Sequence, residues 1–228
     1  MPAPTRTRRG TAPAARWHRE APVQERAHET QERFAAAAEA LLQDQPFEAI
    51  SVQAIARRAG RPVGSFYARF ASKDALLPFL YERYHESLES LITERLAATD
   101  WPRLGFLATL EGVVDFLLGL YDDRRWLIRA LALFTRQRPE ALPADLVERR
   151  RRVYDHVVAV LIRHRARIRH SDPEAAIRFG VFLISAVARE KLLFGDAPHS
   201  RVTPLTRRAL RAELVRALRG YLTTEARP

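Results

Sequence analysis

The sequence predicts an all-α protein of about nine helices, with three in an N-terminal helix-turn-helix domain and the rest in a larger C-terminal domain. From Thr30 onward apolar residues recur at helical spacing, and no segment shows the alternation typical of a strand. The length of 228 residues and the hydrophobic fraction of 47% allow a small domain joined to a larger one with a packed core. Gly60 stands between two short helical segments, where a helix-turn-helix has its turn.

The N-terminal domain is expected over residues 29–88, with the helix-turn-helix at 51–70. Its first helix, over residues 31–43, carries an apolar stripe of Phe34, Ala38, Leu41 and Leu42. Ser51 is placed to cap a second helix, whose apolar residues are Val52, Ile55, Ala56 and Ala59. A third helix is expected over residues 63–69, with Phe66 and Phe70 directed inward.

Residues 1–28 are expected to form a disordered basic arm, because they are rich in Pro, Ala, Thr and Arg without helical apolar periodicity. Such an arm beside a helix-turn-helix can lie in an adjacent minor groove. A solvated tail without a specific role is the equal alternative.

A long helix over residues 73–97 is expected to begin after Ser72 and to lead into the C-terminal domain, residues 89–225. Further helices are expected to open at Pro102 and to cover residues 124–134, 144–168 and 205–222. Asp172 is placed to cap another, with Pro173 at its first helical position. Between residues 175 and 188 that helix is apolar nearly all round, so it has to be covered on every side.

Several classes of site are excluded by the residue content. The chain has no cysteine, which excludes disulfides, thiolate metal sites and cysteine nucleophiles. Its seven histidines show no His-Glu-x-x-His spacing, and residues 60–65 lack the Gly-Lys-Ser/Thr ending of a phosphate loop. We therefore expect no metal, no cofactor and no enzymatic activity. The uncharged apolar run at 179–188 is too short to span a bilayer, and no signal peptide is visible, which predicts a cytoplasmic protein.

The distribution of charge is more informative than its total. The net charge is +11, but residues 30–90 are close to neutral. Within them, residues 51–73 carry Arg57, Arg58, Arg61, Arg69 and Lys73 and no acidic residue, between flanks rich in Glu and Asp. A helix-turn-helix that excludes carboxylates is shaped for the phosphates of a DNA duplex.

Residues 30–84 resemble the tetracycline-repressor (TetR) family of bacterial regulators. The resemblance is carried by FAAAAEALL, PFEAISVQAIARRAG and GSFYARFASKDALL, in that order and at that spacing. It implies an all-helical homodimer that binds a palindromic DNA operator and is released by a small molecule in the C-terminal domain. The C-terminal domain itself matches only in the number and order of helices.

The resemblance also implies individual DNA contacts. Ser51, Tyr67 and Lys73 fall on phosphate-contacting positions, and Gln53 on a first-turn position that reaches the DNA. Ser65 and Arg69 complete the expected DNA-binding set together with the four residues of the turn described next.

The turn departs from the family pattern V-S-x-G-T, since Arg61, Pro62, Val63 and Gly64 precede Ser65 here. Pro62 replaces the polar cap and is expected at the first helical position. Pro62 and Val63 offer only apolar contacts, for which thymine methyls are the natural targets. Arg61 is expected at a phosphate or at a guanine edge, and Gly64 is expected to let the backbone approach the DNA closely.

A small apolar or aromatic effector is expected in the C-terminal domain, because aromatic side chains line ligand pockets in helical bundles. The candidate ligand-binding residues are Phe106, Glu111, Asp115, Trp126, Tyr154 and Phe182. For the aromatic residues a place in the core is the alternative, and for the two carboxylates a solvated edge. The arginine-rich runs at 148–152 and 163–170 are expected to be solvated faces of one helix.

A homodimer through the last two helices is expected, because one subunit cannot bury the apolar helix at 175–188 alone. Pairing would set two recognition helices about one DNA turn, roughly 34–36 Å, apart on a palindromic site. The sequence therefore predicts a sequence-specific DNA-binding transcriptional regulator, in particular a repressor. The alternative is an architectural DNA-binding protein with little sequence preference.

Overall fold

The computed structural model describes residues 17–141 and 145–224, and its regular elements there are all helical. The all-α prediction is confirmed. The α-helices are α1 (Trp17–Leu42), α2 (Val52–Arg58), α3 (Val63–Tyr67), α4 (Leu76–Ala97), α5 (Phe106–Asp123), α6 (Arg125–Gln137), α7 (Leu146–Leu161), α8 (Pro173–Ala188), α9 (Pro198–Val202) and α10 (Arg207–Thr223). The short α9 is the one that the sequence did not indicate.

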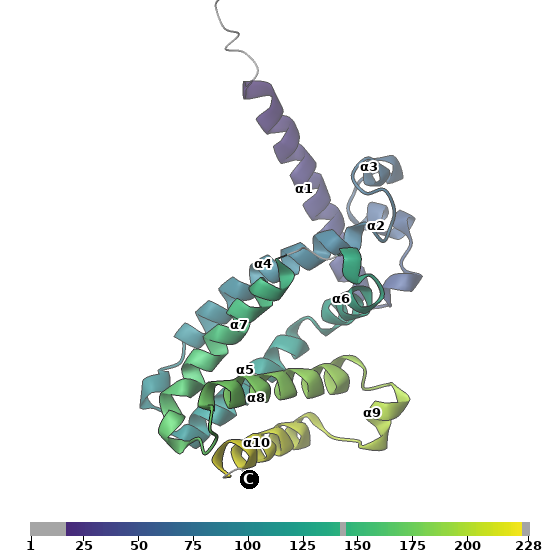
Figure 1. The fold of residues 1–228 in the computed structure, drawn as a ribbon. Helices are drawn as coiled ribbons and strands as arrows, with labels where there is room; N and C mark the ends of the chain where they lie inside the picture. Colours follow the sequence, from purple (N-terminus) through teal and green to yellow (C-terminus); the bar gives the residue numbers. More distant parts are fainter. Residues whose placement is uncertain (1–16, 142–144, 225–228) are drawn as a thin grey trace, which may run out of the picture.

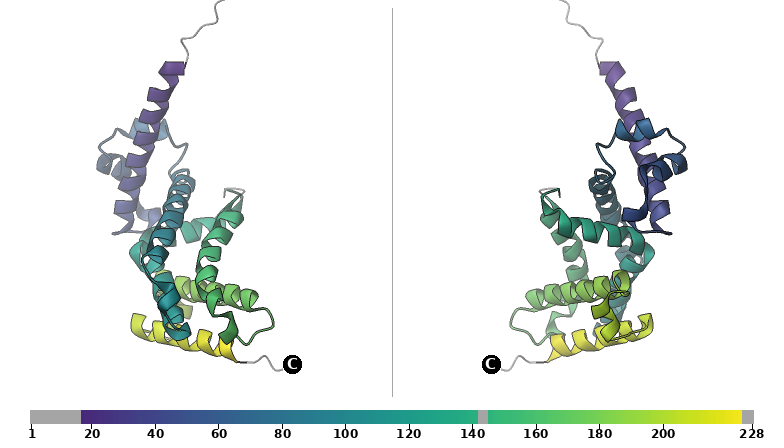
Figure 2. Two further views of the ribbon diagram at one scale, coloured as in Figure 1. Left: turned by 90° about the vertical axis from the view of Figure 1, so that its left-hand side faces the viewer. Right: turned by 90° about the vertical axis from the view of Figure 1, so that its right-hand side faces the viewer.

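The helices are arranged along an elongated molecule (Figure 1). The N-terminal helices α1, α2 and α3 lie at one end, and α8 and α10 pack on each other at the other end. Both side views show the same separation of α10 from α2 and α3 (Figure 2). Between the two ends, α4 runs beside α7 and connects the N-terminal helices to the body.

The predicted disordered arm is wrong for residues 17–28, which belong to α1. Seven of its twelve residues are Ala, Glu, Gln or Arg, which have high helix propensity even without an apolar stripe, although Pro22 lies among them. A salt bridge between Glu29 and Arg33, at 2.7 Å, adds support on the exposed side of the helix. The rest of the arm, residues 1–16, lies outside the described residues.

Several predicted helix boundaries also shift. The α4 helix begins at Leu76 instead of Lys73, because the amides of Leu76 and Leu77 bond to carbonyls only three residues back. Pro102 lies in a 3₁₀ turn, and α5 starts later, at Phe106. The α7 helix ends at Leu161 and continues as a 3₁₀ segment.

His164, within that 3₁₀ segment (Ile162–Arg167), contacts another helix. Its Nε2 is 2.9 Å from the hydroxyl of Thr109 on α5, and its backbone is non-helical. The contact with α5 therefore accompanies the loss of regular α-helix before Ile168, which the residue pattern alone did not reveal.

The turn of the helix-turn-helix forms as local rules predict. The Ser51 hydroxyl accepts a bond from the amide of Ala54 at 3.1 Å and so caps α2. Gly60 has φ +63°, the left-handed conformation that ends α2 and redirects the chain. Phe66 and Phe70 face inward, and Phe66 meets Phe34 of α1 edge-to-face at 5.2 Å.

The described chain has two hydrophobic cores. The C-terminal core joins α5, α7, α8, α10 and the second half of α4. The N-terminal core is formed by α1, α2, α3 and the first half of α4, and four residues of α6 complete it, namely Leu127, Ala130, Leu131 and Phe134. The N-terminal core therefore contains a helix that comes from the C-terminal domain.

Candidate DNA-binding surface and helical cavity

The surface of α2 and α3 carries most of the predicted DNA-binding side chains. Ser51, Gln53, Pro62, Tyr67 and Arg69 are exposed, and 53% of the Tyr67 surface is accessible although its neighbour Phe66 is buried. Arg61, Val63 and Ser65 are partly exposed, and Gly64 is exposed. Nine of the ten predicted residues lie within residues 51–69, and all nine are at least partly exposed. Exposed Arg57 and Arg58 on the last turn of α2 add positive charge to it.

The prediction that Pro62 occupies the first helical position of α3 is wrong by one residue. Pro62 has ψ 150°, so its backbone is extended and it serves as the N-cap, with Val63 first in the helix. No side chain caps α3. The amide of Ser65 bonds to the Pro62 carbonyl at 3.0 Å, which closes the first turn without a polar cap.

Lys73, the tenth predicted residue, is engaged with the protein itself. Its ammonium donates to the carbonyls of Phe47, Glu48 and Ile50 at 2.9, 3.1 and 3.0 Å, and lies 4.8 Å from the centroid of the Phe47 ring. These bonds use the three donors of a lysine and fix the 3₁₀ turn (Phe47–Ala49) that precedes α2. Contact between Lys73 and a phosphate stays a prediction, and it would compete with these carbonyls.

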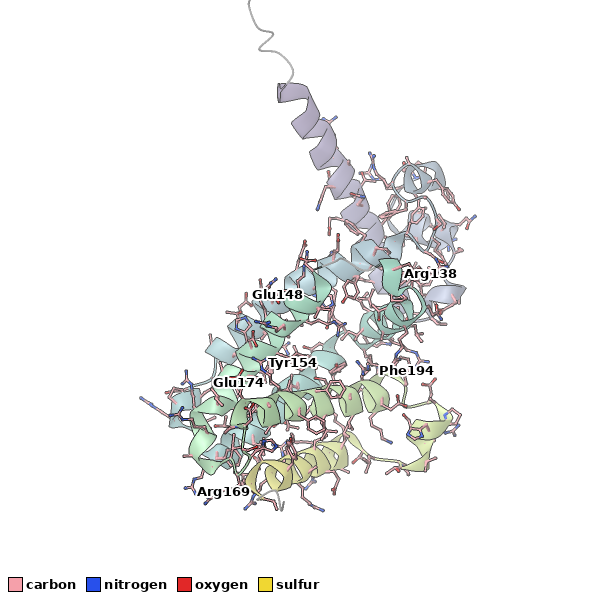
Figure 3. The ribbon with its side chains drawn as sticks, viewed as in Figure 1. Arg138, Glu148, Tyr154, Arg169, Glu174 and Phe194 are labelled. Atoms are coloured by element: carbon pink, nitrogen blue, oxygen red, sulfur yellow. The ribbon has the colours of Figure 1, made fainter. Side chains whose placement is uncertain are left out.

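A cavity of about 400 Å³ lies in the C-terminal domain, between α4, α5, α6, α7 and α8. This volume is within the range of small-molecule sites, and the lining is largely apolar and aromatic. The aromatic and polar members of the lining are Tyr81, Tyr84, His85, Tyr121, Thr135, Arg136, Arg150, Tyr154, Phe182, Ser185 and Arg189. Tyr154, on α7, is labelled in Figure 3.

Two of the six predicted ligand-binding residues, Tyr154 and Phe182, line this cavity. Glu111 and Asp115 do not, because both pair with Arg211 of α10, at 3.5 and 2.6 Å. Their interpretation as ligand-orienting groups is therefore not supported by their position, and the alternative of a surface edge fits it better.

The other two predicted residues also lie outside the cavity. Phe106 packs against the C-terminal core, with its ring 5.8 Å from that of His164. Trp126 lies at a smaller recess together with Arg125, whose guanidinium is 4.8 Å from the indole centroid. Phe106 thus fits the alternative interpretation, a place at the core, whereas Trp126 is 36% exposed and lies in neither the cavity nor a hydrophobic core.

Arg150 is exposed, as the prediction of a solvated face over residues 148–152 holds, but it also lines the cavity and donates to the hydroxyl of Tyr81 at 3.3 Å, which the prediction missed. The spacing of residues in the sequence already indicates that Arg150 can reach the cavity. Arg150 lies four residues after Leu146 and three before Val153, and therefore on the apolar stripe of α7. Similarly, Tyr81, Tyr84 and His85 share one face of α4 by their spacing.

The imidazole and the phenols of the cavity are neutral at neutral pH, and its arginines are cationic. Burial is the main reason that the pKa of His85 falls to about 4, and the charges of Arg150 and Arg149 lower it further. Burial likewise raises the pKa of the Tyr84 and Tyr121 phenols. At neutral pH the cavity therefore presents a neutral imidazole and neutral phenol donors.

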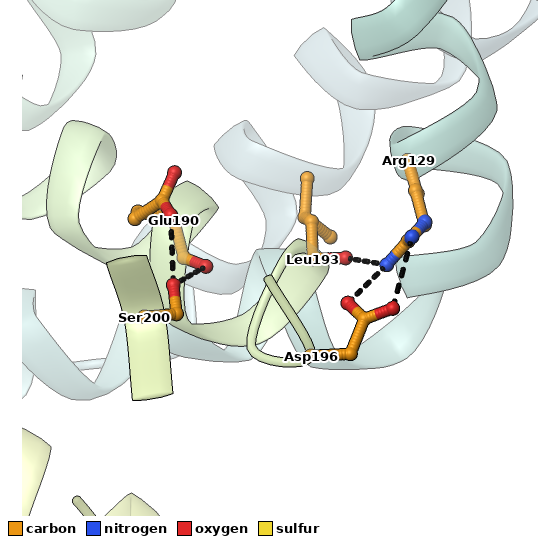
Figure 4. Close-up of polar contacts among 5 residues, drawn as sticks. All are labelled: Arg129, Glu190, Leu193, Asp196 and Ser200. Atoms are coloured by element: carbon orange, nitrogen blue, oxygen red, sulfur yellow. Dashed lines mark hydrogen bonds and ion pairs between the residues drawn. The ribbon is translucent and has the colours of Figure 1, made fainter. Parts of the chain in front are cut away.

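A polar cluster fastens the end of α8 to α6 beside the cavity (Figure 4). After α8 the chain makes a π-helical turn, Arg189–Leu193. Arg129 of α6 donates to the Leu193 carbonyl and to the Asp196 carboxylate, the latter at 2.8 Å. On the other side of the turn, Ser200 donates to the Glu190 carboxylate at 2.7 Å. The ring of Phe194, labelled in Figure 3, lies 5.2 Å from the Arg129 guanidinium.

Within residues 17–141 and 145–224, no group of three or more His, Asp or Glu side chains is placed to hold a metal ion. No helix in that same part of the chain has the length and hydropathy needed to cross a bilayer.

Residues 35–78 match the family model of bacterial regulatory proteins of the tetR family. No curated protein matches the chain. Several solved structures match the chain. A tetR-family regulatory protein from Rhodococcus RHA1 is 17% identical, with a TM-score of 0.58 over 86% of this chain and 98% of its own. A TetR-family regulator from Agrobacterium tumefaciens is 18% identical, with a TM-score of 0.55 over 87% of this chain and 100% of its own. PfmR from Thermus thermophilus, a TetR-family transcriptional regulator, is 17% identical, with a TM-score of 0.52 over 86% of this chain and 100% of its own.

These matches confirm the resemblance seen in the sequence. Structural matches at less than 20% sequence identity show the fold alone, while the family model covers the helix-turn-helix segment itself. Residues 35–78 thus match the tetR family of bacterial regulatory proteins, and the chain as a whole has the fold of TetR-family transcriptional regulators.

Proposed function

We propose that the protein is a homodimeric repressor that binds a palindromic operator through α2 and α3 of each subunit and is released by a small molecule bound in the cavity. The observation that carries this proposal is the surface of residues 51–69, which exposes arginines and small polar groups and contains no carboxylate. Such a surface suits a phosphate backbone, and a family match at residues 35–78 supports the same use.

The shared helices support coupling between the cavity and the DNA-binding surface. Leu131 of α6 and Tyr81 of α4 each line the cavity and also belong to the N-terminal core. A ligand that moves either side chain must therefore disturb the packing beneath α2 and α3, because packed cores are not continuously deformable. Release of DNA by a ligand follows if the liganded packing sets the two recognition helices at a spacing that the operator does not fit.

An exposed aromatic patch supports dimerisation through α8 and α10. Phe179 and Phe182 of α8 are 50% and 54% exposed, and Tyr221 of α10 is 36% exposed, with its ring 5.4 Å from that of Phe179. Large exposed aromatic side chains on adjacent helices are typical of an interface. A twofold axis through this patch would leave α2 and α3 at the outer ends of both subunits, free to meet consecutive grooves (Figure 2).

The proposal is tested by comparing affinity for the protein's own promoter DNA with affinity for random duplex DNA of the same length. We expect a preference of at least about 10³ at physiological salt, because base contacts add to the phosphate contacts. Footprinting should show two half-sites related by a dyad. Equal affinity for both duplexes would identify the architectural mode of binding instead.

Gly64→Ala tests whether the backbone of α3 approaches DNA closely. A Cβ at residue 64 would meet no protein atom within 4 Å, so the fold should gain about 0.5–1 kcal/mol from the better helix propensity of alanine. Operator affinity should nevertheless fall by roughly tenfold or more, because the new methyl occupies space against the DNA.

Gly220→Ala in α10 is the matched control, since a Cβ there also meets nothing within 4 Å. It should be equally stable in thermal unfolding and should bind the operator as the parent protein does. Unchanged operator affinity of Gly64→Ala would rule out the close approach at residue 64.

Phe179→Glu tests the dimer interface. A buried, unpaired carboxylate at a twofold contact is costly, so this variant should elute as a monomer in size-exclusion chromatography with light scattering and should lose operator binding. Val147→Glu is the control, because Val147 is 78% exposed on α7, away from the aromatic patch. A dimeric Phe179→Glu protein with intact operator binding would place the interface elsewhere.

A further inference from the structure

The lining of the cavity contains three arginines and no carboxylate. Arg136 comes from α6, Arg150 from α7 and Arg189 from the start of the π-helical turn, and neither Asp nor Glu is among the lining residues. The remaining polar members are phenols, hydroxyls and an imidazole. A cavity of this composition has a positive potential that no part of its own wall balances.

The three guanidinium groups also lack ion pairs among the described residues. Arg150 donates to a neutral partner, the Tyr81 hydroxyl, and Arg136 lies over the ring of Phe194 at 5.3 Å. Two other arginines of α7 behave differently, since Arg149 pairs with Asp145 at 2.6 Å and Arg152 with Glu89 at 3.6 Å. The arginines that meet the cavity therefore keep their charge available for a ligand.

Arg150, Arg189 and Tyr121 line the same cavity. Burial raises the pKa of this phenol, while the charges of Arg189 and Arg150 act in the opposite direction, so both guanidinium groups lie close enough to influence its hydroxyl. The pKa of His85 is lowered first by burial and then by Arg150 and Arg149. An anion near Tyr121 would meet cationic groups from two helical segments and a neutral phenol donor.

We propose that the cavity binds an organic carboxylate, with the carboxylate between Arg150, Arg189 and the Tyr121 hydroxyl and an aromatic or aliphatic body against the apolar wall. The apolar wall is formed by Leu88, Leu117, Leu120, Ile128, Val157 and Val181. This assignment rests on the proposed function, in which the cavity is the effector site, and it adds an anionic group to the small apolar or aromatic effector expected from the sequence. The volume of about 400 Å³ suits a small organic acid.

The position of Arg189 gives the carboxylate a route to the DNA-binding domain. Arg189 opens the π-helical turn whose last carbonyl, that of Leu193, accepts a bond from Arg129 of α6 (Figure 4). Single π-helical turns are frequent at functional sites. An anion that draws Arg189 into the cavity therefore acts on a segment hydrogen-bonded to α6, the helix that completes the N-terminal core.

The test is isothermal titration calorimetry of the full-length protein with matched probes. The aromatic set is 2-naphthoate, 2-naphthamide and 2-naphthylmethylammonium, and the aliphatic set is decanoate, decanamide and decylammonium. In at least one set we expect the carboxylate to bind about tenfold or more tightly than its amide, with the ammonium weakest, because hydrogen bonds between charged groups are the stronger ones.

Arg150→Gln and Arg189→Gln should each reduce carboxylate affinity about tenfold while leaving amide affinity unchanged. Arg152→Gln is the matched control on α7 and should change neither. Circular dichroism of each variant confirms that it is folded, and the two cavity variants check each other should one be destabilised.

Equal affinity for carboxylate and amide in both sets, absence of binding by all probes at millimolar concentration, or tighter binding of the ammonium would each overturn the assignment. So would an equal effect of the arginine variants on carboxylate and amide. Operator binding by the same unliganded preparations is measured in parallel, so failure of the anion assignment is distinguishable from failure of the proposed repressor function.

Discussion

The packing of α6 into the N-terminal core is the constraint on which the rest of this structure depends. Phe134 and Leu127 of α6 are buried with residues of α1, α2 and α4, although α6 belongs in sequence to the C-terminal domain. Neither domain can therefore be repacked without the other. A helix-turn-helix of two short helices, α2 and α3, has little core of its own and gains its rigidity from this support.

The same arrangement connects the cavity with the helices that we propose to bind DNA. One face of α6 packs toward α1 and α4, and the other forms a wall of the cavity through Ile128, Ala132 and Thr135. Coupling between two sites needs an element with more than one arrangement that both sites influence. Helix α6, tied to the π-helical turn by Arg129, has the contacts that such an element requires.

The parts of the fold that follow local rules could be predicted from the sequence. The Ser51 cap, the left-handed Gly60 and the Asp172 cap with Pro173 all depend on residues within one turn of each other. The long-range parts could not be predicted in this way. Asp115 pairs with an arginine 96 positions later, so its use as a surface partner is invisible to local spacing.

The contacts of two charged side chains, Arg150 and Lys73, also could not be predicted from local spacing. The sequence predicts a solvated face for residues 148–152, because most of their arginines lie outside the apolar stripe of α7. Arg150 lies on that stripe, and it lines the cavity while it remains exposed. Lys73 was assigned to a phosphate by resemblance, while its ammonium is bound by three carbonyls of the chain. For both residues the sequence gives the charge of the side chain, but the partner of that charge depends on how the helices pack.

The dependence of the helix-turn-helix on α6 is measured most directly by native-state hydrogen exchange of the full-length protein with Phe134→Ala. Phe134 is buried in the N-terminal core and does not line the cavity, so its truncation should cost about 3–5 kcal/mol without altering the ligand site. The account predicts that the free energy of opening falls together for the amides of α2, α3 and α6. Loss of protection in α6 alone, with α2 and α3 unchanged, would contradict it.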